Sequence, residues 1–489
     1  MKLKVKFLKL TAGRPVAILH KHFAEKASIH VDDRIFIGRD HKKIAAVVDI
    51  AVGILKEDEI ALSTELISPL NLRENSLVQI EIAPKPESLE LIHKKLSCKT
   101  LNRKELEKIM KDIVCNNLTE SEIAYFISAV YKCGMNMQET ADMTKAIVKT
   151  GKQLRLRGKV ADKHSIGGVP GRTTPIVVSI CASTGLVVPK TSSRAITSPA
   201  GTADAMETIC KVDLSLEEIK KVIKKSHACL VWGGSLNLAP ADDKIIQVER
   251  LLNLDPEAQL LASIIAKKLA VDSKYVLIDI PYGKNAKVSK KSGEELASKF
   301  NKLAKYFQIK IECSLKETPE PLGNGIGPAL EIKDVIQVLR RESSCHKLES
   351  RALELSAKLL ELTGKAEKGK GYELAKKILD SGKAYEKFRE IVSLQHGNIN
   401  GVMNKTSKFK RDIFSTKHGK LAEIKTQDIN LIARISGCPL DKFAGIYLYK
   451  HLNDKIKKHE KLLTIYSESQ SELNEAVKHY HKTNPMVIK

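Results

Sequence analysis

Donors for an anion gather between residues 163 and 174, where the sequence reads KHSIGGVPGRTT. Lys163 supplies a positive charge, and Ser165 and Thr174 supply hydroxyl groups. The run from Thr173 onward predicts a helix whose N-terminus favours an anion. The stretch also contains glycines that permit positive φ and let a ligand approach the backbone N–H groups, namely Gly167, Gly168 and Gly171. These features together are typical of a phosphate pocket.

A second donor-rich loop covers residues 192–202 and reads SSRAITSPAGT. Arg194 can grip a phosphate with two parallel N–H bonds. The loop also offers hydroxyl donors, which are Ser192, Ser193, Thr197, Ser198 and Thr202. Glycine- and hydroxyl-rich loops also occur as ordinary strand-to-helix turns, so each loop alone is a weak signal. Two such loops so close in the sequence favour phosphate, and they indicate two anionic groups or one anion and a sugar.

The region after the second loop adds an acid and further polar residues. Asp255 falls at the N-terminal edge of a predicted helix, Ser263 lies two turns into that helix, and Lys287 follows a predicted strand. Asp242 and Asp243 stand at the start of an earlier predicted helix, so we interpret them as dipole partners without a catalytic role. From the residues alone, Asp255 would also be interpreted as a helix cap.

Two periodicities predict the elements that precede the donor loops. Residues 1–84 alternate apolar and polar residues in short runs bounded by turns, which predicts a small N-terminal β domain. Residues 85–150 change to a helical period and predict a helical domain. Within it, Thr119 and Glu122 are spaced as a capping box, and Gly134 is placed to end that helix.

An α/β framework is expected to position the two loops. Residues 151–400 alternate buried-strand patterns with helices and predict a large α/β phosphate-binding domain with a mixed sheet. Residues 242–272 carry a helical pattern that we assign to the helical domain instead. Residues 401–489 combine short strands, turns and a terminal helix, which predicts a C-terminal α+β module. The fold class expected is therefore a multidomain α/β protein.

Composition narrows the class of protein. The 489 residues, 43% of them hydrophobic, are many for one core and predict two to four domains. A net charge of +24 and a pI near 9.4 indicate attraction to anions such as nucleic acid, acidic lipid or phosphorylated small molecules. Because the lysines are spread through the helical stretches, we interpret most of them as a solvated surface.

Cysteines and apolar runs indicate a cytoplasmic protein. Nine cysteines are scattered with an odd total and no CxxC pair, so neither a disulfide framework nor a zinc site is expected. The basic N-terminus has no continuous apolar core or cleavage site, so we do not expect a signal peptide. No run of 18 apolar residues predicts a membrane span. The histidines near the N-terminus match no common ligand spacing, so no metal is expected.

The motifs resemble those of a known family. KHSIGGV followed by SSRAITSPAGTADAME resembles the signature of the thymidine phosphorylase family, in its archaeal branch that acts on nucleoside 5′-monophosphates. The resemblance covers essentially the whole chain and is strongest over residues 163–207 and 240–335. It implies phosphorolysis, in which inorganic phosphate attacks the anomeric carbon of the ribose and the base leaves. AMP, and also CMP and UMP, would then give a free base and ribose 1,5-bisphosphate.

The resemblance also implies roles for single residues. Asp255 matches the family's proton donor, and its burial against an apolar helix face is expected to raise its pKa so that it keeps the proton. Inorganic phosphate would be held by Lys163, Ser165, Ser192 and Thr202. The nucleotide would be contacted by Gly168, Ser193, Arg194, Ala195, Ile196, Thr197, Ser198, Thr202, Ser263 and Lys287.

The resemblance further implies the partners of the chain. They are a small-molecule nucleotide and inorganic phosphate as co-substrate, without a cofactor. Members of this branch carry an extra N-terminal β domain that mediates higher assembly. We therefore expect a homodimer that assembles further through residues 1–84, with no membrane and no specific nucleic acid as a partner.

Three alternatives remain open at this point. Thymidine and pyrimidine nucleoside phosphorylases share the signature, but they read the pyrimidine with an Arg where this chain has Val248, although the matching Lys267 is present. A basic nucleic-acid-binding protein with a degenerate phosphorylase fold suits the charge, but one Trp and no recognisable binding module argue against it. A phosphoribosyltransferase of similar architecture would need pyrophosphate chemistry and Mg²⁺.

Overall fold

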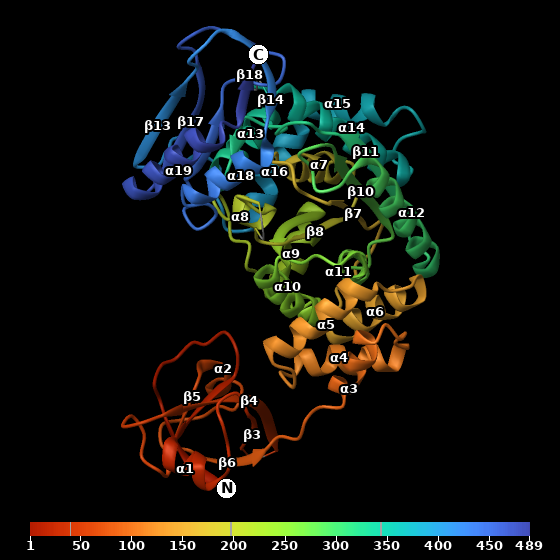
Figure 1. The fold of residues 1–489 in the computed structure, drawn as a ribbon. Helices are drawn as coiled ribbons and strands as arrows, with labels where there is room; N and C mark the ends of the chain where they lie inside the picture. Colours follow the sequence, from red (N-terminus) through yellow and green to blue (C-terminus); the bar gives the residue numbers. More distant parts are fainter. Residues whose placement is uncertain (40, 196–197, 343–344) are drawn as a thin grey trace. The chain divides into compact units, whose positions relative to one another are not determined.

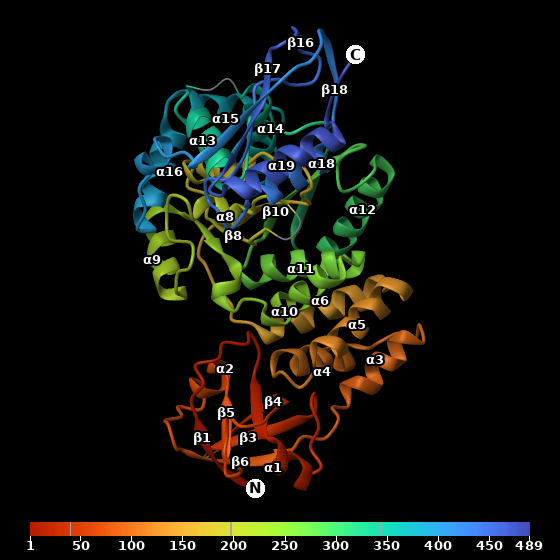
Figure 2. The same ribbon diagram turned by 60° about the vertical axis from the view of Figure 1, so that its left-hand side comes forward.

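The computed structural model divides into two compact units (Figure 1; Figure 2). The first unit contains Met1–Thr150 and Pro240–Ser263, and the second contains Gly151–Ala239 and Ile264–Lys489. The structure describes residues 1–39, 41–195, 198–342 and 345–489. Among these residues, no helix is both long and apolar enough to cross a bilayer.

Six strands at the N-terminus close into a barrel, drawn in red in Figure 1. Their order is β1-β5-β2-β4-β3-β6, and their bounds are β1 Lys2–Lys6, β2 Val16–His20, β3 Arg34–Arg39, β4 Lys42–Ala51, β5 Glu59–Leu62 and β6 Leu77–Ile82. Alternate residues such as Leu3 and Val5 point into a buried apolar core, because successive side chains on a strand face opposite sides. Short helices, α1 Lys21–Lys26 and α2 Thr64–Ile67, lie in the connections.

Helices make up the rest of the first unit. They are α3 Ser88–Leu96, α4 Arg103–Val114, α5 Glu120–Cys133, α6 Met137–Thr150, α10 Pro240–Leu252 and the start of α11, Glu257–Ala270. The predicted capping box begins α5, where Thr119 Oγ1 accepts from the Glu122 N–H and Glu122 Oε2 accepts from the Thr119 N–H. Gly134, with φ of 63°, ends the helix as predicted. Local sequence signals therefore set both ends of α5.

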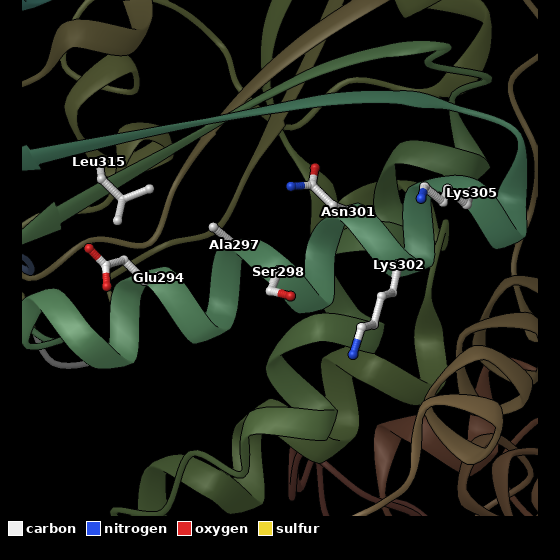
Figure 3. Close-up of a pocket in the computed structure, with 7 residues that line it drawn as sticks. All are labelled: Glu294, Ala297, Ser298, Asn301, Lys302, Lys305 and Leu315. Carbon is white, nitrogen blue, oxygen red and sulfur yellow. The ribbon is translucent and has the colours of Figure 1, made fainter.

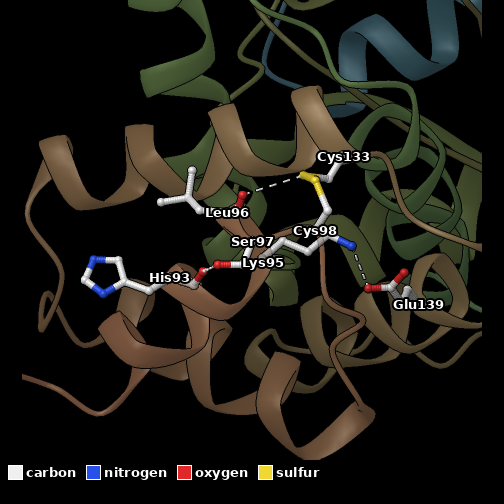
Figure 4. Close-up of a disulfide and its surroundings, with 7 residues drawn as sticks. All are labelled: His93, Lys95, Leu96, Ser97, Cys98, Cys133 and Glu139. Carbon is white, nitrogen blue, oxygen red and sulfur yellow. Dashed lines mark hydrogen bonds and ion pairs between the residues drawn. A yellow bond between two sulfur atoms is a disulfide. The ribbon is translucent and has the colours of Figure 1, made fainter.

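A disulfide in the helical part corrects the expectation that the chain has none. Cys98, directly after α3, is bonded to Cys133 at the end of α5 (Figure 4). Lys95 and Glu139 form a buried ion pair of 2.8 Å near this bond. The cysteines are 35 residues apart in the sequence and meet because α3 packs against α5. Scattered cysteines carry no spacing signal for a pair that tertiary packing brings together.

The second unit holds the α/β part around two parallel sheets. Their orders are β11-β10-β7 and β8-β9, and the strands are β7 Ala161–Ser165, β8 Val188–Ser192, β9 Ala228–Trp232, β10 Tyr275–Tyr282 and β11 Lys310–Glu317. A parallel bridge between Val160 and Val187 joins the two sheets. Every pairing within them is parallel, so the predicted mixed sheet is wrong for these strands. Helical crossovers between the strands return the chain in the same direction each time.

Helices surround these sheets in the second unit (Figure 2). The helix α7, Thr173–Ala182, starts where the sequence predicted, and all of its residues are buried. It packs against β7, β8 and β9 as well as α14 and α16, so its N-terminus is fixed beside β7. The other helices are α8 Thr202–Met206, α9 Leu216–Ser226, α12 Lys290–Phe307, α13 Pro328–Leu339, α14 His346–Leu362, α15 Gly371–Asp380, α16 Lys383–Leu394 and α17 Asn400–Met403. The boundary between the units falls inside α11, Glu257–Ala270.

The C-terminal part has the α+β composition that the sequence predicted, and it is drawn in blue in Figure 1. Its elements are β13 Phe409–Phe414, β14 Gly419–Ile424, α18 Thr426–Ile435, β15 Gly445–Leu448, β16 Lys455–Ile456, β17 Lys461–Ser467, α19 Gln470–Thr483 and β18 Met486–Ile488. The short strand β12, Gly325–Ile326, pairs antiparallel with β15. A segment of the α/β part thus completes a sheet of the C-terminal module.

Candidate phosphate and nucleotide site

Strand β7 presents its side chains alternately to two faces. Lys163 and Ser165 lie on one face, while Asp162 and His164 lie on the other. The parallel pairing of β7 with β10 sets Asp279 directly opposite Ser165, so both side chains point to the same face. The two residues predicted to hold phosphate therefore share a face with a carboxylate.

Asp279 is a buried carboxylate that contacts both predicted phosphate ligands. Its Oδ2 accepts a hydrogen bond from Ser165 Oγ at 3.1 Å and lies 3.3 Å from Lys163 Nζ. Its Oδ1 accepts from Arg351 Nη2 of α14 at 2.5 Å. Burial would raise the pKa of Asp279, but Lys163 and Arg351 outweigh that effect and hold the pKa below its usual value. Asp279 is therefore a charged carboxylate near neutral pH.

Lys163 joins this carboxylate to the start of α7. Its side chain is 1% exposed, and its Nζ donates to Thr173 Oγ1 at 3.0 Å and to Thr174 Oγ1 at 3.4 Å. Burial lowers the pKa of Lys163, and Asp279 opposes that shift. The ammonium group thus lies in the first turn of a buried helix, where the helix dipole favours an anion.

The glycine turn between β7 and α7 has the backbone that the sequence predicted. Gly167, Gly168 and Gly171 have φ of 86°, 95° and 123°. A Cβ at Gly168 would lie 2.9 Å from the backbone nitrogen of Lys287, and one at Gly171 would lie 2.7 Å from Leu322 Cβ. Gly168 and Lys287 were both predicted to contact the nucleotide. The structure brings these two positions together across a gap that only glycine fits.

Pockets among the described residues of the second unit include two that we compare with the predicted site. One surrounds Lys287 and is lined by Tyr282, Gly283, Lys284, Ala286, Lys287, Val288, Ser289, Lys290 and Glu317. The other lies along α12 and is lined by Glu294, Ala297, Ser298, Asn301, Lys302, Lys305 and Leu315 (Figure 3). None of the predicted site residues lines the pocket on α12. The other pocket has three lysines in its lining, and one of them, Lys287, is a predicted site residue.

Asp204 organises the second donor loop. Its Oδ2 accepts from the Ala195 N–H at 2.6 Å and from the Gly201 N–H at 2.8 Å, and its Oδ1 accepts from Arg194 Nη1 at 3.3 Å. A Cβ at Gly201 would lie 2.5 Å from the Ser193 carbonyl oxygen, so the two ends of the loop close tightly. A buried carboxylate of the chain itself thus holds this loop in shape.

Arg194 is already engaged by side chains of the second unit. Its Nη1 and Nη2 donate to the two oxygens of Glu207 at 2.8 and 2.6 Å, and its guanidinium lies 4.9 Å from the centre of the Trp232 ring. Lys442 of the C-terminal part also pairs with Glu207. The bond from Arg194, together with Lys442, lowers the pKa of Glu207 to about 2. The residue predicted to grip phosphate therefore donates to carboxylates of its own chain in this structure.

Arg172 connects the two donor loops. Its Nη2 donates to the Ala200 carbonyl oxygen in the second loop, and its Nε lies 2.5 Å from Glu331 Oε2 on α13. Ser198 Oγ donates to the same Ala200 oxygen at 2.9 Å. Of the other hydroxyls, Ser192 Oγ at the end of β8 is buried without a hydrogen-bond partner among the described residues. The predicted contacts Ile196 and Thr197 lie outside the described residues.

A second buried carboxylate lies on the opposite face of β7. Asp162 Oδ2 accepts from Lys268 Nζ of α11 at 2.9 Å, and its Oδ1 accepts from Lys190 Nζ of β8 at 3.3 Å. Burial lowers the pKa of Lys268 to about 7, although Asp162 opposes that shift. Burial and the neighbouring ammonium groups of Lys268 and Lys190 lower the pKa of His164 well below 6.5. None of the predicted phosphate ligands belongs to this cluster.

Asp255 and Ser263 belong to the first unit. Asp255 precedes α11 and is exposed, so the expected burial of this acid is wrong in the described chain. Ser263 Oγ donates to Asp242 Oδ2 at 2.8 Å, and Gln259 Nε2 donates to Asp242 Oδ1 at 3.2 Å. Asp242, interpreted from the sequence as a dipole partner, thus also holds the hydroxyl of a predicted substrate contact.

Several carboxylates and one arginine of the site were not singled out from the sequence. They are Asp204, Glu207, Asp279 and Arg351. Asp279 carried a usable signal, because it is a charged residue inside the otherwise apolar strand run YVLIDIPY. Arg351 had no such signal, since it lies in one of many basic helices and its partner is set by packing.

Comparisons with known proteins agree with this architecture. Three family models match, namely the helical bundle domain of the glycosyl transferase family at residues 89–151, its a/b domain at residues 157–385, and the pyrimidine nucleoside phosphorylase C-terminal domain at residues 420–486. The AMP phosphorylase of Pyrococcus horikoshii is 44% identical over 100% of this chain and 98% of its own. Those of Methanocaldococcus jannaschii and Thermococcus kodakarensis are 40% and 39% identical, over 97% and 100% of this chain and 95% and 98% of their own.

A solved structure is similar in fold. The anthranilate phosphoribosyltransferase of Thermus thermophilus matches with a TM-score of 0.53 and 17% identity. The match covers 63% of this chain and 99% of that enzyme. At this identity the likeness concerns the fold alone.

Proposed function

The chain belongs to the AMP phosphorylase branch of the thymidine phosphorylase family, and we propose that it cleaves nucleoside 5′-monophosphates with inorganic phosphate. The observation that carries the proposal is the similarity of 39–44% identity to AMP phosphorylases over nearly the full length of both chains. AMP is the first substrate and CMP and UMP are further ones. The products are the free base and ribose 1,5-bisphosphate.

The attacking phosphate binds at the first turn of α7. Lys163 contributes its ammonium group, and Ser165, Ser192 and Thr202 contribute hydroxyls. The buried Ser192 Oγ, which has no partner among the described residues, supports this assignment because a bound anion would supply its missing acceptor. Inorganic phosphate is the co-substrate, and no cofactor takes part.

The nucleotide binds at the second loop and beside Lys287. Its contacts are Gly168, residues 193–198, Thr202, Ser263 and Lys287. The short approach between Gly168 and the Lys287 backbone supports a shared contact surface for the nucleotide. Arg194 donates charge-assisted hydrogen bonds to the 5′-phosphate, which competes with Glu207 for this guanidinium.

Asp255 acts as the general acid. Cleavage of the glycosidic bond develops positive charge on the ribose and negative charge on the base, so a proton must reach the base as it leaves. A positioned acid contributes roughly 10²- to 10⁴-fold to such a step. Asp255 is exposed in the described residues.

A nucleoside phosphorylase is the main competing function. Enzymes of that kind read the pyrimidine with an arginine at the position of Val248, which is a buried apolar residue of α10 in this chain and offers no hydrogen-bond donor. This difference favours nucleotides over nucleosides. The similarity in fold to a phosphoribosyltransferase does not favour pyrophosphate chemistry, because it concerns the fold alone.

Assembly follows from the family branch. We propose a cytoplasmic homodimer that assembles further through the N-terminal barrel. Deletion of residues 1–84 is then expected to leave a dimer, which size-exclusion chromatography with light scattering measures.

A phosphate-dependence assay tests the function. The full chain is incubated separately with AMP, CMP, UMP, thymidine and uridine, with and without inorganic phosphate, and the free base is measured by chromatography. We expect base release from the nucleotides only when phosphate is present. Cleavage of thymidine or uridine at rates equal to those for the nucleotides would contradict the proposal.

The variant Asp255→Asn tests the acid in the same assay. We expect it to lower turnover at least about a hundredfold, because an amide cannot donate the proton. Nucleotide binding, followed by calorimetry, should stay within a few-fold of the unmodified chain. Near-normal turnover would remove Asp255 from the mechanism.

A further inference from the structure

The hydroxyl of Ser165 has its only proton committed within the protein. Ser165 Oγ donates to Asp279 Oδ2 at 3.1 Å, and the hydroxyl has no second hydrogen to give. The parallel register of β7 and β10 places these residues side by side, so the contact is built into the sheet. The same register also brings the Ile166 N–H to the Asp279 carbonyl oxygen at 2.9 Å. Ser165 therefore has only its lone pairs left for a ligand.

Asp279 cannot reverse the direction of this bond. It lies between two cations, with Arg351 Nη2 at 2.5 Å and Lys163 Nζ at 3.3 Å, and its side chain is 6% exposed. Arg351 is itself fixed, because its Nη2 also donates to the Ser314 carbonyl oxygen and its Nη1 donates to Glu354, both at 3.1 Å. A carboxylate in such surroundings stays ionised and can only accept hydrogen bonds.

We propose that Asp279 is a positioning residue that makes Ser165 a hydrogen-bond acceptor, so that the pocket selects an oxyanion that carries a proton. Near neutral pH, inorganic phosphate still has a P–OH group, whereas sulfate has no proton to donate. The inference rests on the proposed function, since it takes Lys163 and Ser165 as ligands of the attacking phosphate. It adds to that function a basis for discrimination between two anions of similar size and shape.

The same bond orients the attacking phosphate. Its P–OH group donates to Ser165 Oγ, which directs the unprotonated oxygens away from Asp279 and toward donors. The first turn of α7 provides such donors, and the ammonium charge of Lys163 lies beside them. Thr173 Oγ1 keeps its own proton because it accepts from Lys163. An oxygen that carries negative charge is thus left to attack the ribose, while the protonated oxygen is held in the protein.

Ser192 offers a matched comparison for Ser165. Both were assigned to phosphate, and both carry one hydroxyl at the end of a parallel strand. Ser192 Oγ is buried and has no hydrogen-bond partner among the described residues, so its proton is available to an anion. Ser192 should therefore donate equally well to phosphate and to sulfate, whereas Ser165 should favour phosphate alone.

Calorimetric titration of the full-length chain with inorganic phosphate and with sulfate tests the inference. The variants are Ser165→Ala, Asp279→Asn and the control Ser192→Ala, all studied at pH 7. We expect the unmodified chain to bind phosphate at least about tenfold more tightly than sulfate, because a mismatched buried hydrogen bond has a cost of that order. The ratio should fall to within about threefold in S165A and D279N.

The control separates discrimination from simple loss of affinity. S192A should weaken phosphate and sulfate by similar factors and keep the ratio of the unmodified chain. Equal binding of the two anions by the unmodified chain, or an unchanged ratio in S165A, would overturn the inference; S165A decides the matter if D279N does not fold. Because binding is measured without turnover, a chain that discriminates between the anions but does not release base would count against the proposed function instead.

Discussion

Two buried carboxylates lie on opposite faces of β7, and each is shared by two cations. On the face of the predicted phosphate pocket, Asp279 lies between Lys163 and Arg351. On the other face, Asp162 lies between Lys190 and Lys268. Each carboxylate therefore has two cationic partners, yet only Asp279 is also bonded to a hydroxyl assigned to phosphate, that of Ser165.

The clusters differ in how firmly their charge is fixed. A guanidinium stays protonated at all ordinary pH values, so Arg351 keeps Asp279 paired regardless of solution conditions. The other cluster contains two ammonium groups, and burial lowers the pKa of Lys268 to about 7. The positive charge of Lys268 can therefore be lost near neutral pH. The pocket face therefore keeps the charge of Arg351 at every ordinary pH, whereas the opposite face can lose the charge of Lys268.

The largest expected effect comes from removing one lysine on each face. Lys163→Met should lower kcat/KM for phosphate by roughly a hundredfold, because a charged donor to the anion is lost and Asp279 is left facing the pocket. Lys190→Met should lower it by less than about tenfold, since Asp162 keeps Lys268 as its partner. Initial rates at varied phosphate concentration measure both values.

Comparable losses in the two lysine variants would break this distinction between the faces. Far-ultraviolet circular dichroism should confirm that both variants are folded before their rates are compared. A loss confined to K163M would show that the charge on the pocket face serves the anion and that the charge on the opposite face serves packing.

A smaller effect is expected from Arg351→Lys. Arg351 donates to Asp279, Ser314 and Glu354 at once, and a lysine ammonium cannot reproduce that planar arrangement. We expect KM for phosphate to rise about tenfold and the free energy of unfolding to fall by about 1–3 kcal/mol. Steady-state kinetics and denaturant titration measure the two quantities.

Arg341→Lys provides the matched control for that substitution. Arg341 also pairs with two carboxylates, Glu349 and Asp380, but its side chain is 35% exposed. Because exposed ion pairs contribute little, the control should change neither KM for phosphate nor the free energy of unfolding by a measurable amount. If R341K and R351K behaved alike, the permanent charge beside Asp279 would have no special role.

Local signals in the sequence predicted much of the pocket face. The glycines at 167, 168 and 171 predicted the turn, Thr173 predicted the start of α7, and Lys163 and Ser165 were recognised as donors for an anion. These features depend on neighbouring residues, so spacing and residue type are sufficient to read them. The capping box at Thr119 was readable for the same reason.

Contacts between distant segments could not be read in this way. Asp279 acts on Ser165 only because β7 and β10 pair in parallel at one register, and Arg351 comes from a helix much later in the chain. The bidentate bond of Arg194 to Glu207 likewise depends on how the second loop closes. The residues that could bind phosphate were therefore recognised in the sequence, whereas the carboxylates that hold those residues in place were not.

The smallest expected effect concerns the pH dependence of stability on the opposite face. A buried lysine with a pKa of about 7 binds fewer protons in the folded chain than in the unfolded chain between that pH and its ordinary value of 10.5. Stability contributed by Lys268 should therefore rise as pH increases through this range. Lys268→Met removes the titrating group, so the free energy of unfolding of K268M should rise less between pH 7 and pH 10 than that of the unmodified chain.

Denaturant titration at pH 7, 8, 9 and 10 measures this difference, with Lys274→Met as the control. Lys274 is 60% exposed and pairs with Asp272 on the surface, so its removal should leave the pH dependence unchanged. If K268M kept the full rise in stability, Lys268 would be a permanent cation like Arg351. The cations on the two faces of β7 would then be equally permanent. The hydroxyl groups of the pocket face alone would then explain why phosphate binds on that face and not on the other.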